Sequence, residues 1–149
     1  MFDLTSGDPA SNSMQVLVNA WEEGSFSPVH MHLDYDEVFV AISGELAFFT
    51  FSPPQGGATK PTATCHIIST SGTRLLVVPR GEHHAMTAAP RSMGYSGRAL
   101  VMEASGHTFN PRIQTKFLHP AFGASLDGQD GLREDFKQLL LSCPSALSA

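Results

Sequence analysis

Short runs rich in Val, Ile, Phe and Thr recur along the chain, and Gly and Pro residues separate them. Short strands with turn signals about every ten residues are typical of an all-β sandwich or barrel. The pattern predicts eight strands, over residues 14–21, 26–32, 37–43, 45–51, 64–70, 73–78, 83–88 and 97–104. The length of 149 residues suits one compact domain, so we expect a single domain over residues 1–149.

Two segments depart from the strand pattern. Residues 52–63 contain several Pro and Gly and few apolar side chains, which predicts a loop. This loop is long for a hairpin connection, and we expect either a lid over the barrel mouth or an insertion without fixed structure. In the tail, a short helix over about residues 130–142 is predicted by the helical spacing of Leu132, Phe136, Leu139 and Leu140. Its apolar stripe would pack on the barrel or on a partner chain.

Composition and charge exclude several kinds of partner. Nine Lys and Arg against fourteen Asp and Glu give a formal net charge of -5, and the basic residues form no cluster. A nucleic-acid or membrane-surface partner requires clustered basic residues, so we expect neither. The longest apolar runs, such as residues 38–42, are far shorter than the ~20 residues of a membrane-spanning helix.

The start of the chain and its cysteines bear on the cellular compartment. Residues 1–10 lack the basic stretch and apolar core of a signal peptide. Cys65 and Cys143 match no C-x-x-C pattern, and two cysteines do not make a disulfide framework. A reduced, cytoplasmic setting is the simpler interpretation, and a single disulfide bond stays open as the alternative.

The chemistry is concentrated in residues 24–44. His30 and His32 are two positions apart, and side chains alternate faces along a strand, so both imidazoles point the same way. Glu37 follows at an odd spacing that would turn it to the opposite face of an uninterrupted strand. Two Asp residues within 33–36 favour a turn, so we expect the chain to bend there and bring Glu37 to the histidines.

After Glu37 the pattern predicts a hairpin. Ser43 and Gly44 suit a two-residue turn, which would pair Phe39 with Phe48 on adjacent strands. One face of this hairpin is an apolar pocket wall that ends in the Glu37 carboxylate. The other face is also apolar, so we expect the N-terminal strand, the tail helix or a second subunit to cover it.

A second segment supplies another histidine. Residues 75–78 form a Leu- and Val-rich strand, and residues 79–81 provide a turn. His84 opens the next strand, from which it would meet the two histidines and the glutamate of the first segment inside a barrel. Three imidazoles and one carboxylate suit Fe, Mn, Co, Ni, Cu or Zn. Four protein ligands leave two positions of a six-coordinate shell open for substrate, water or oxygen.

Both segments resemble the motifs of the cupin superfamily. The first motif, G-x5-H-x-H-x4-E-x6-G, matches at every fixed position, which here are Gly24, His30, His32, Glu37 and Gly44. The core of the second motif, P-x-G-x2-H, matches at Pro79, Gly81 and His84. The second motif departs in the spacing from Gly72 to Pro79 and in Ala88, where the family has Asn. Neither departure falls on a metal ligand of the family.

The resemblance covers about residues 14–105 and implies an all-β double-stranded β-helix, a jelly-roll barrel of the cupin type. It also implies one divalent transition metal, held by His30, His32, Glu37 and His84. Fe2+ is the leading candidate, with Mn2+, Ni2+ and Zn2+ as alternatives. Dimers are frequent in the family, so we expect a homodimer. Cupins include many kinds of enzyme as well as binders, so the fold does not settle the reaction.

The leading functional hypothesis is an Fe(II)-type dioxygenase that acts on a fairly hydrophobic small molecule with chelating oxygen atoms. Glu37 would serve as ligand and as base, and the phenol of Tyr35 as a proton donor or acceptor. The substrate pocket would be lined by Phe26, Phe39, Phe48 and Met86.

Two alternatives stay open. The first is a non-redox, metal-dependent isomerase, cyclase, lyase or decarboxylase, for instance in secondary metabolism. The second is a cupin that binds a ligand without turnover. Among the other histidines, His66 is a further candidate for the pocket and His83 is expected on the opposite face. We expect no metal role for His107 or His119.

Overall fold

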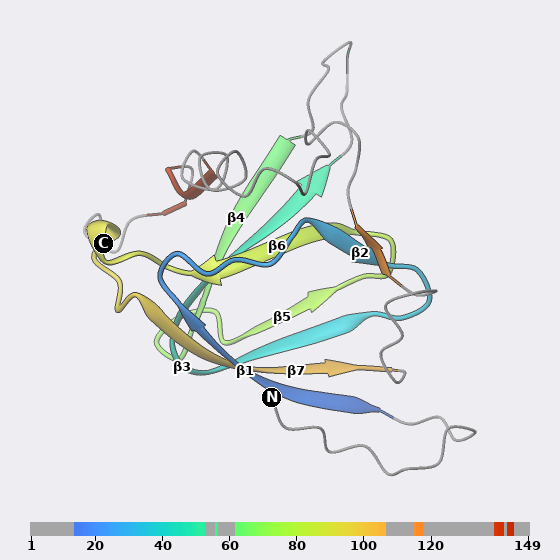
Figure 1. The fold of residues 1–149 in the computed structure, drawn as a ribbon, viewed down its shortest axis with the longest axis horizontal. Coiled ribbons are helices and arrows are strands. Elements are labelled where there is room, and N and C mark those ends of the chain that lie inside the picture. The colour runs from blue at the N-terminus through green and yellow to red at the C-terminus, as the bar shows by residue number, and fades with distance from the viewer. Residues whose placement is uncertain are drawn as a thin grey trace.

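The computed structural model describes residues 14–52, 56, 62–106, 115–117, 139–141 and 143–144, and these build two layers of antiparallel strands (Figure 1). The strands are β1 (Gln15–Glu22), β2 (His30–His32), β3 (Glu37–Ser52), β4 (Thr62–Ser69), β5 (Leu75–Val78), β6 (His83–Ala88), β7 (Arg98–Ser105) and β8 (Thr115–Phe117). One short 3-10 helix, Arg91–Met93, lies between β6 and β7. The all-β prediction is confirmed, and the strands lie close to their predicted positions.

Strand β3 belongs to both layers. Its first half lies between β5 and β7, and β1 extends that layer beyond β7. Its second half lies between β4 and β6, and β2 and β8 extend the second layer beyond β6. Figure 1 shows β2, β4 and β6 in one layer and β1, β5 and β7 in the other. We call the layer with β1 the first layer and the layer with β2 the second layer.

The predicted hairpin turn at Ser43 and Gly44 is wrong, because β3 continues through both residues and pairs them with β7. The register shifts between Ala41 and Ser43, and the backbone of Gly44 has a φ of 69°. A Cβ atom at position 44 would lie 2.1 Å from the carbonyl oxygen of Arg98. Glycine is therefore required here for close approach to β7, where the strand bends from one layer into the other.

The interior between the layers is apolar and contains the face predicted for β3. Phe39 from the first half and Phe48 from the second half are both buried, with ring centroids 4.9 Å apart. They meet across the interior and are not paired on adjacent strands, since the two halves of β3 lie in different layers. The remaining buried members of this inner core are Ala41, Leu46, Ile68, Val78, Met86, Ala99 and Val101.

The outer face of the second layer is covered. Phe49 and Phe51 are buried there, and Leu139 and Leu140 of the tail pack against the same cluster. Cys65 on β4 forms a disulfide bond with Cys143, so the prediction of reduced cysteines is wrong. The cysteines are 78 positions apart in the sequence, and only the packing of the tail on β4 brings them together. Disulfides are rare in the cytoplasm, so the expected cytoplasmic setting loses its support.

The outer face of the first layer has a different environment. Ile42, Leu75 and Val77 are 43%, 53% and 51% exposed, which is high for large apolar side chains. Most of the predicted loop 52–63 and helix 130–142 lie outside the described residues, and Leu139 and Leu140 have helical backbone. Within the described part of the chain, no helix is long and apolar enough to cross a membrane.

Candidate metal centre

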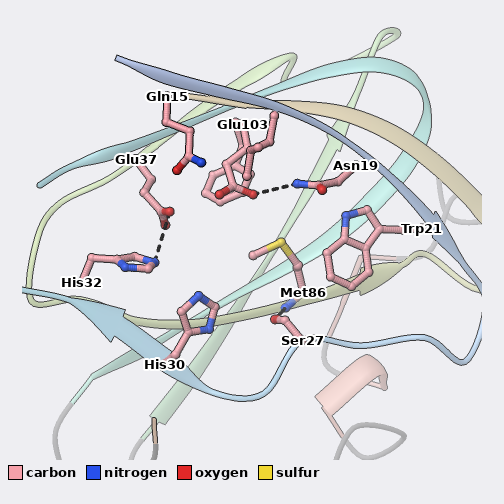
Figure 2. A pocket seen from close by; sticks show the side chains of 11 residues that line it. Gln15, Asn19, Trp21, Ser27, His30, His32, Glu37, Met86 and Glu103 are labelled. Carbon is pink, nitrogen blue, oxygen red and sulfur yellow. Dashed lines mark hydrogen bonds and ion pairs between the residues drawn. The ribbon is translucent and has the colours of Figure 1, made fainter. Parts of the chain in front are cut away.

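Four side chains from three strands converge inside the barrel. His30 and His32 come from β2, Glu37 from the start of β3 and His84 from β6. One ligand atom from each residue lies within 4.8 Å of all the others. Glu37 Oε1 is 3.1 Å from His32 Nε2, and Glu37 Oε2 is 3.1 Å from His84 Nε2. We call these four residues the histidine cluster; Figure 2 shows three of them at one end of a cavity.

Local chain geometry brings the four candidate ligands together. His30 is the Cα partner of His84 on the neighbouring strand, so the two rings lie side by side with centroids 4.2 Å apart. The chain leaves strand geometry between β2 and β3, which turns Glu37 inward. The Gly81 N–H donates to the carbonyl of His32 over 2.6 Å, and this bond fixes the β5–β6 turn beside β2.

Backbone carbonyls set the tautomer of two histidines. His30 Nδ1 is 2.8 Å from the carbonyl oxygen of Pro28, and His84 Nδ1 is 3.0 Å from that of Glu82. A carbonyl oxygen only accepts hydrogen bonds, so the Nδ1 atom must donate in each case. In a neutral ring with this tautomer the lone pair is on Nε2, the atom that can bind a metal.

Tyr35 lies behind His32. Its side chain is buried, its hydroxyl is 2.7 Å from His32 Nδ1, and the two rings stack with centroids 4.6 Å apart. Tyr35 is not among the residues that line the cavity. Its position therefore favours a role in orienting His32, in place of the proton-transfer role expected from the sequence.

The protonation states of His30 and Glu37 match those of metal ligands. Burial and the neighbouring His84 lower the pKa of His30 to about 4. For Glu37, burial alone would raise the pKa, but the contacts with His32 and His84 outweigh burial and lower the pKa to about 2. At neutral pH the His30 ring is therefore neutral and the Glu37 carboxylate is ionised, as metal ligation requires.

A buried contact between a carboxylate and an imidazole supports the same conclusion. Glu37 Oε2 and His84 Nε2 are buried and face each other over 3.1 Å. A carboxylate oxygen and an imidazole nitrogen at this distance attract each other only with a proton or a cation between them. The donor set of the histidine cluster thus fits a divalent transition metal.

The histidine cluster opens into a cavity of about 330 Å³ (Figure 2). The apolar side chains of its lining are Leu17, Trp21, Phe39 and Met86. The polar residues outside the histidine cluster are Gln15, Asn19, Ser27 and Glu103. Strands of both layers contribute to the wall, so the cavity lies between the layers.

Comparison with solved structures identifies the architecture. NovW, a 4-keto-6-deoxy sugar epimerase from Streptomyces spheroides, is 14% identical with a TM-score of 0.57, and the match covers 90% of this chain and 71% of NovW. A dTDP sugar isomerase from Desulfovibrio desulfuricans G20 is 13% identical with a TM-score of 0.57, over 77% of this chain and 72% of the isomerase. These similar structures have the jelly-roll architecture of the cupin superfamily. This chain has the cupin fold.

The chain spans only about a third of another similar protein. CapF, a capsular polysaccharide assembling protein from Staphylococcus aureus, is 17% identical with a TM-score of 0.55, over 78% of this chain and 34% of CapF. No protein-family model matches the sequence, and no curated protein matches it. Identities this low establish a common fold and leave the activity open.

Two of the four residues predicted to line the pocket do so, and two do not. Phe39 and Met86 line the cavity. Phe48 is stacked on His84, with ring centroids 5.5 Å apart, and is not part of the lining. Phe26 packs with the outer core of the second layer because its neighbour Ser27 faces the cavity and successive side chains point to opposite sides.

The other histidines lie outside the cavity lining or outside the described residues. His66 Nε2 is 3.3 Å from Thr50 Oγ1, and His66 does not line the cavity. His83 pairs with the outward-facing Phe51, so it lies on the opposite face to His84 as predicted. His107 and His119 fall outside the described part of the chain.

Sequence reasoning missed a second polar group in the cavity. Asn19 Nδ2 donates a hydrogen bond to Glu103 Oε2 over 2.8 Å. Burial, followed by the neighbouring charge of Glu37, raises the pKa of Glu103 to about 8. The available signal was a single acidic residue within the apolar run of residues 99–104, on the face of β7 that points inward.

Proposed function

We propose that this cupin is a metal-dependent enzyme that rearranges a small oxygen-containing molecule without net oxidation or reduction, as an isomerase does. The observation that carries the proposal is the buried histidine cluster at one end of a largely apolar cavity. The similar structures include an epimerase and an isomerase, which favours the non-redox alternative over a dioxygenase.

The residues of the site have distinct tasks in this proposal. A divalent cation, when bound, polarises a substrate oxygen as a Lewis acid. The two carbonyl-bonded histidines present Nε2, and Glu37 supplies the negative charge that balances the cation. A carboxylate with a pKa of about 2 is a weak base, so we assign Glu37 to metal binding and withdraw the role of base expected from the sequence. Trp21 and Met86 exclude water, which strengthens the electrostatic interactions in the cavity.

Metal analysis tests the first half of the proposal. Protein purified without added metal should contain about one divalent transition metal per chain, and His84→Ala should contain less than about a tenth of that. His66→Ala is the matched control, because His66 lies on β4 outside the histidine cluster and should keep its metal. A metal-free wild type that also fails to take up Co2+, or a fully loaded His84→Ala, would contradict the proposal.

Solvent exchange tests the second half. Wild-type enzyme is incubated under argon in D2O with a panel of small hydroxyketones and enols, and NMR measures deuterium at the carbon next to the carbonyl. We expect incorporation that requires metal and is lost in His84→Ala. Tropolone, the ring system of an inhibitor bound in a CapF structure, has adjacent hydroxyl and carbonyl oxygens and serves as a chelating probe of the cavity.

A dioxygenase is the second candidate, since four protein ligands leave two positions of a six-coordinate shell for substrate and oxygen. Substrate-dependent oxygen uptake by the iron-loaded protein would select it, and equal turnover under argon would exclude it. Ligand binding without any turnover would select the non-catalytic alternative.

We also propose that the protein is a homodimer that buries the outer face of the first layer. The exposed Ile42, Leu75 and Val77 support this arrangement, because large apolar side chains gathered on one face mark interaction sites. Light scattering should show a dimer for the wild type and a monomer for Val77→Lys. Ser71→Lys, at an exposed polar position, should remain a dimer.

A further inference from the structure

The cavity contains a polar pair outside the histidine cluster, and one member of this pair, Glu103, also contacts Glu37. Asn19 on β1 and Glu103 on β7 both line the cavity and are joined by a hydrogen bond of 2.8 Å (Figure 2). The Cα partners of Glu103 on the adjacent strands are Leu17 and Phe39, so the pair is set into an apolar part of the wall.

Such a pair is unfavourable for folding alone. Burial of a carboxyl and an amide group costs free energy unless their hydrogen bonds are replaced. None of the described residues that line the cavity is Lys or Arg, so Glu103 has no salt bridge with either residue type in the lining. Apolar side chains would fill the same space at lower cost, and a polar pair that faces an apolar cavity is typical of a site that orients a ligand.

We propose that Asn19 and Glu103 form a second polar subsite, which binds a hydroxyl group of the substrate while another oxygen of the same molecule faces the histidine cluster. The inference rests on the proposed function and names its substrate class. A hydroxyl group both donates and accepts hydrogen bonds, and an amide next to a carboxyl group offers both complements.

The remaining wall narrows the substrate class further. Trp21 and Met86 suit an apolar portion of the molecule. None of the described lining residues is Lys or Arg, the side chains that most often hold a phosphate group in proteins. The substrate class is therefore a hydroxylated carbonyl compound with an apolar body.

The test uses Co2+-loaded protein with tropolone and with 3-, 4- and 5-hydroxytropolone, followed by the visible absorption of the cobalt. Tropolone presents only its chelating oxygens, and each derivative adds one hydroxyl group at a different position. Wild type should bind at least one derivative about tenfold more tightly than tropolone. Glu103→Leu and Asn19→Leu should lose that preference and bind tropolone itself within about twofold of wild type.

Controls separate the subsite from the metal centre. Glu22→Leu, at an exposed position on β1, should keep the wild-type preference, and an unchanged cobalt spectrum shows that each variant is folded around its metal. If tropolone does not change the cobalt spectrum of wild type, the proposed chelating function fails. If tropolone binds but no derivative distinguishes wild type from Glu103→Leu and Asn19→Leu, the subsite is wrong and the proposed function stands.

Discussion

Two carboxyl groups lie in the same cavity, and their surroundings give them opposite properties. Glu37 faces the imidazoles of His32 and His84, which lower its pKa to about 2 against the effect of burial. Glu103 lies two positions farther along the inner wall, where burial and the charge of Glu37 raise its pKa to about 8. The environment, and not the residue type, therefore decides which carboxyl group is ionised at neutral pH.

The difference assigns each group a separate task. An ionised carboxylate beside several imidazoles suits a cation, and a protonated carboxyl group in an apolar wall suits hydrogen bonding to a neutral ligand. Substitution of Glu37 and substitution of Glu103 should therefore have different consequences.

The largest expected difference is in metal affinity. Glu37→Gln removes the only negative ligand of the histidine cluster and should weaken Co2+ binding by about 100-fold or more. Glu103→Gln keeps a hydrogen-bonding side chain of the same shape and should change the affinity by less than about threefold. Competition titration with a chelator measures both. Equal losses in the two variants would show that the carboxyl groups act as one unit.

The next largest effect is on the stability of the metal-free protein at different pH values. Glu103 has a pKa of about 8 in the folded protein and an ordinary carboxyl pKa when unfolded, so the folded state binds the extra proton. The contribution of this proton to the free energy of unfolding is fully present at acidic pH and is lost as the pH rises toward 8. His30, with its lowered pKa of about 4, acts in the opposite direction, and most of its effect is reached by about pH 6.5.

Between about pH 6.5 and 8 we therefore expect the free energy of unfolding of wild type to fall by about 1 kcal/mol. Glu103→Gln should remove most of this fall. Urea denaturation at several pH values measures the difference between the two proteins. A parallel pH dependence in both would show that Glu103 does not hold a proton in the folded state.

A smaller effect on metal affinity is expected from substitution of Tyr35, which lies behind His32 of the histidine cluster. Tyr35→Phe removes the hydroxyl that contacts His32 Nδ1 and should weaken Co2+ binding about tenfold, the usual effect of losing a partner that orients a ligand. Tyr95→Phe is the matched control, because the Tyr95 hydroxyl bonds the carbonyl of Pro144 and not the histidine cluster. Equal affinities of the two variants would remove Tyr35 from the metal site.

The smallest effect concerns the partner of Glu103. The hydrogen bond from Asn19 lowers the pKa of Glu103, so Asn19→Ala should raise that pKa by less than about one unit. A 13C NMR titration of the Glu103 carboxyl carbon measures the shift. A decrease in the pKa would show that Asn19 does not stabilise the ionised form.

Much of the histidine cluster could be predicted from local pattern. The two-residue spacing of His30 and His32 places both rings on one face wherever the strand lies, and the acidic segment before Glu37 is suited to bend. Gly44 shows the limit of this reasoning. The neighbouring residues suggested a turn, yet the glycine is needed because β7 lies very close to it. The sequence around Gly44 gives no sign of this contact.

By itself, the sequence determined the strand periodicity, the cupin motifs and the types of ligand that face the interior, because all of these depend on residues a few positions apart. Only the tertiary structure decided the pairing of Asn19 with Glu103, which are 84 positions apart, and the disulfide between Cys65 and Cys143. Such contacts depend on which strands become neighbours and how the tail packs. Which strands become neighbours depends on burial of the apolar surface of the whole chain, so it cannot be predicted from any single segment.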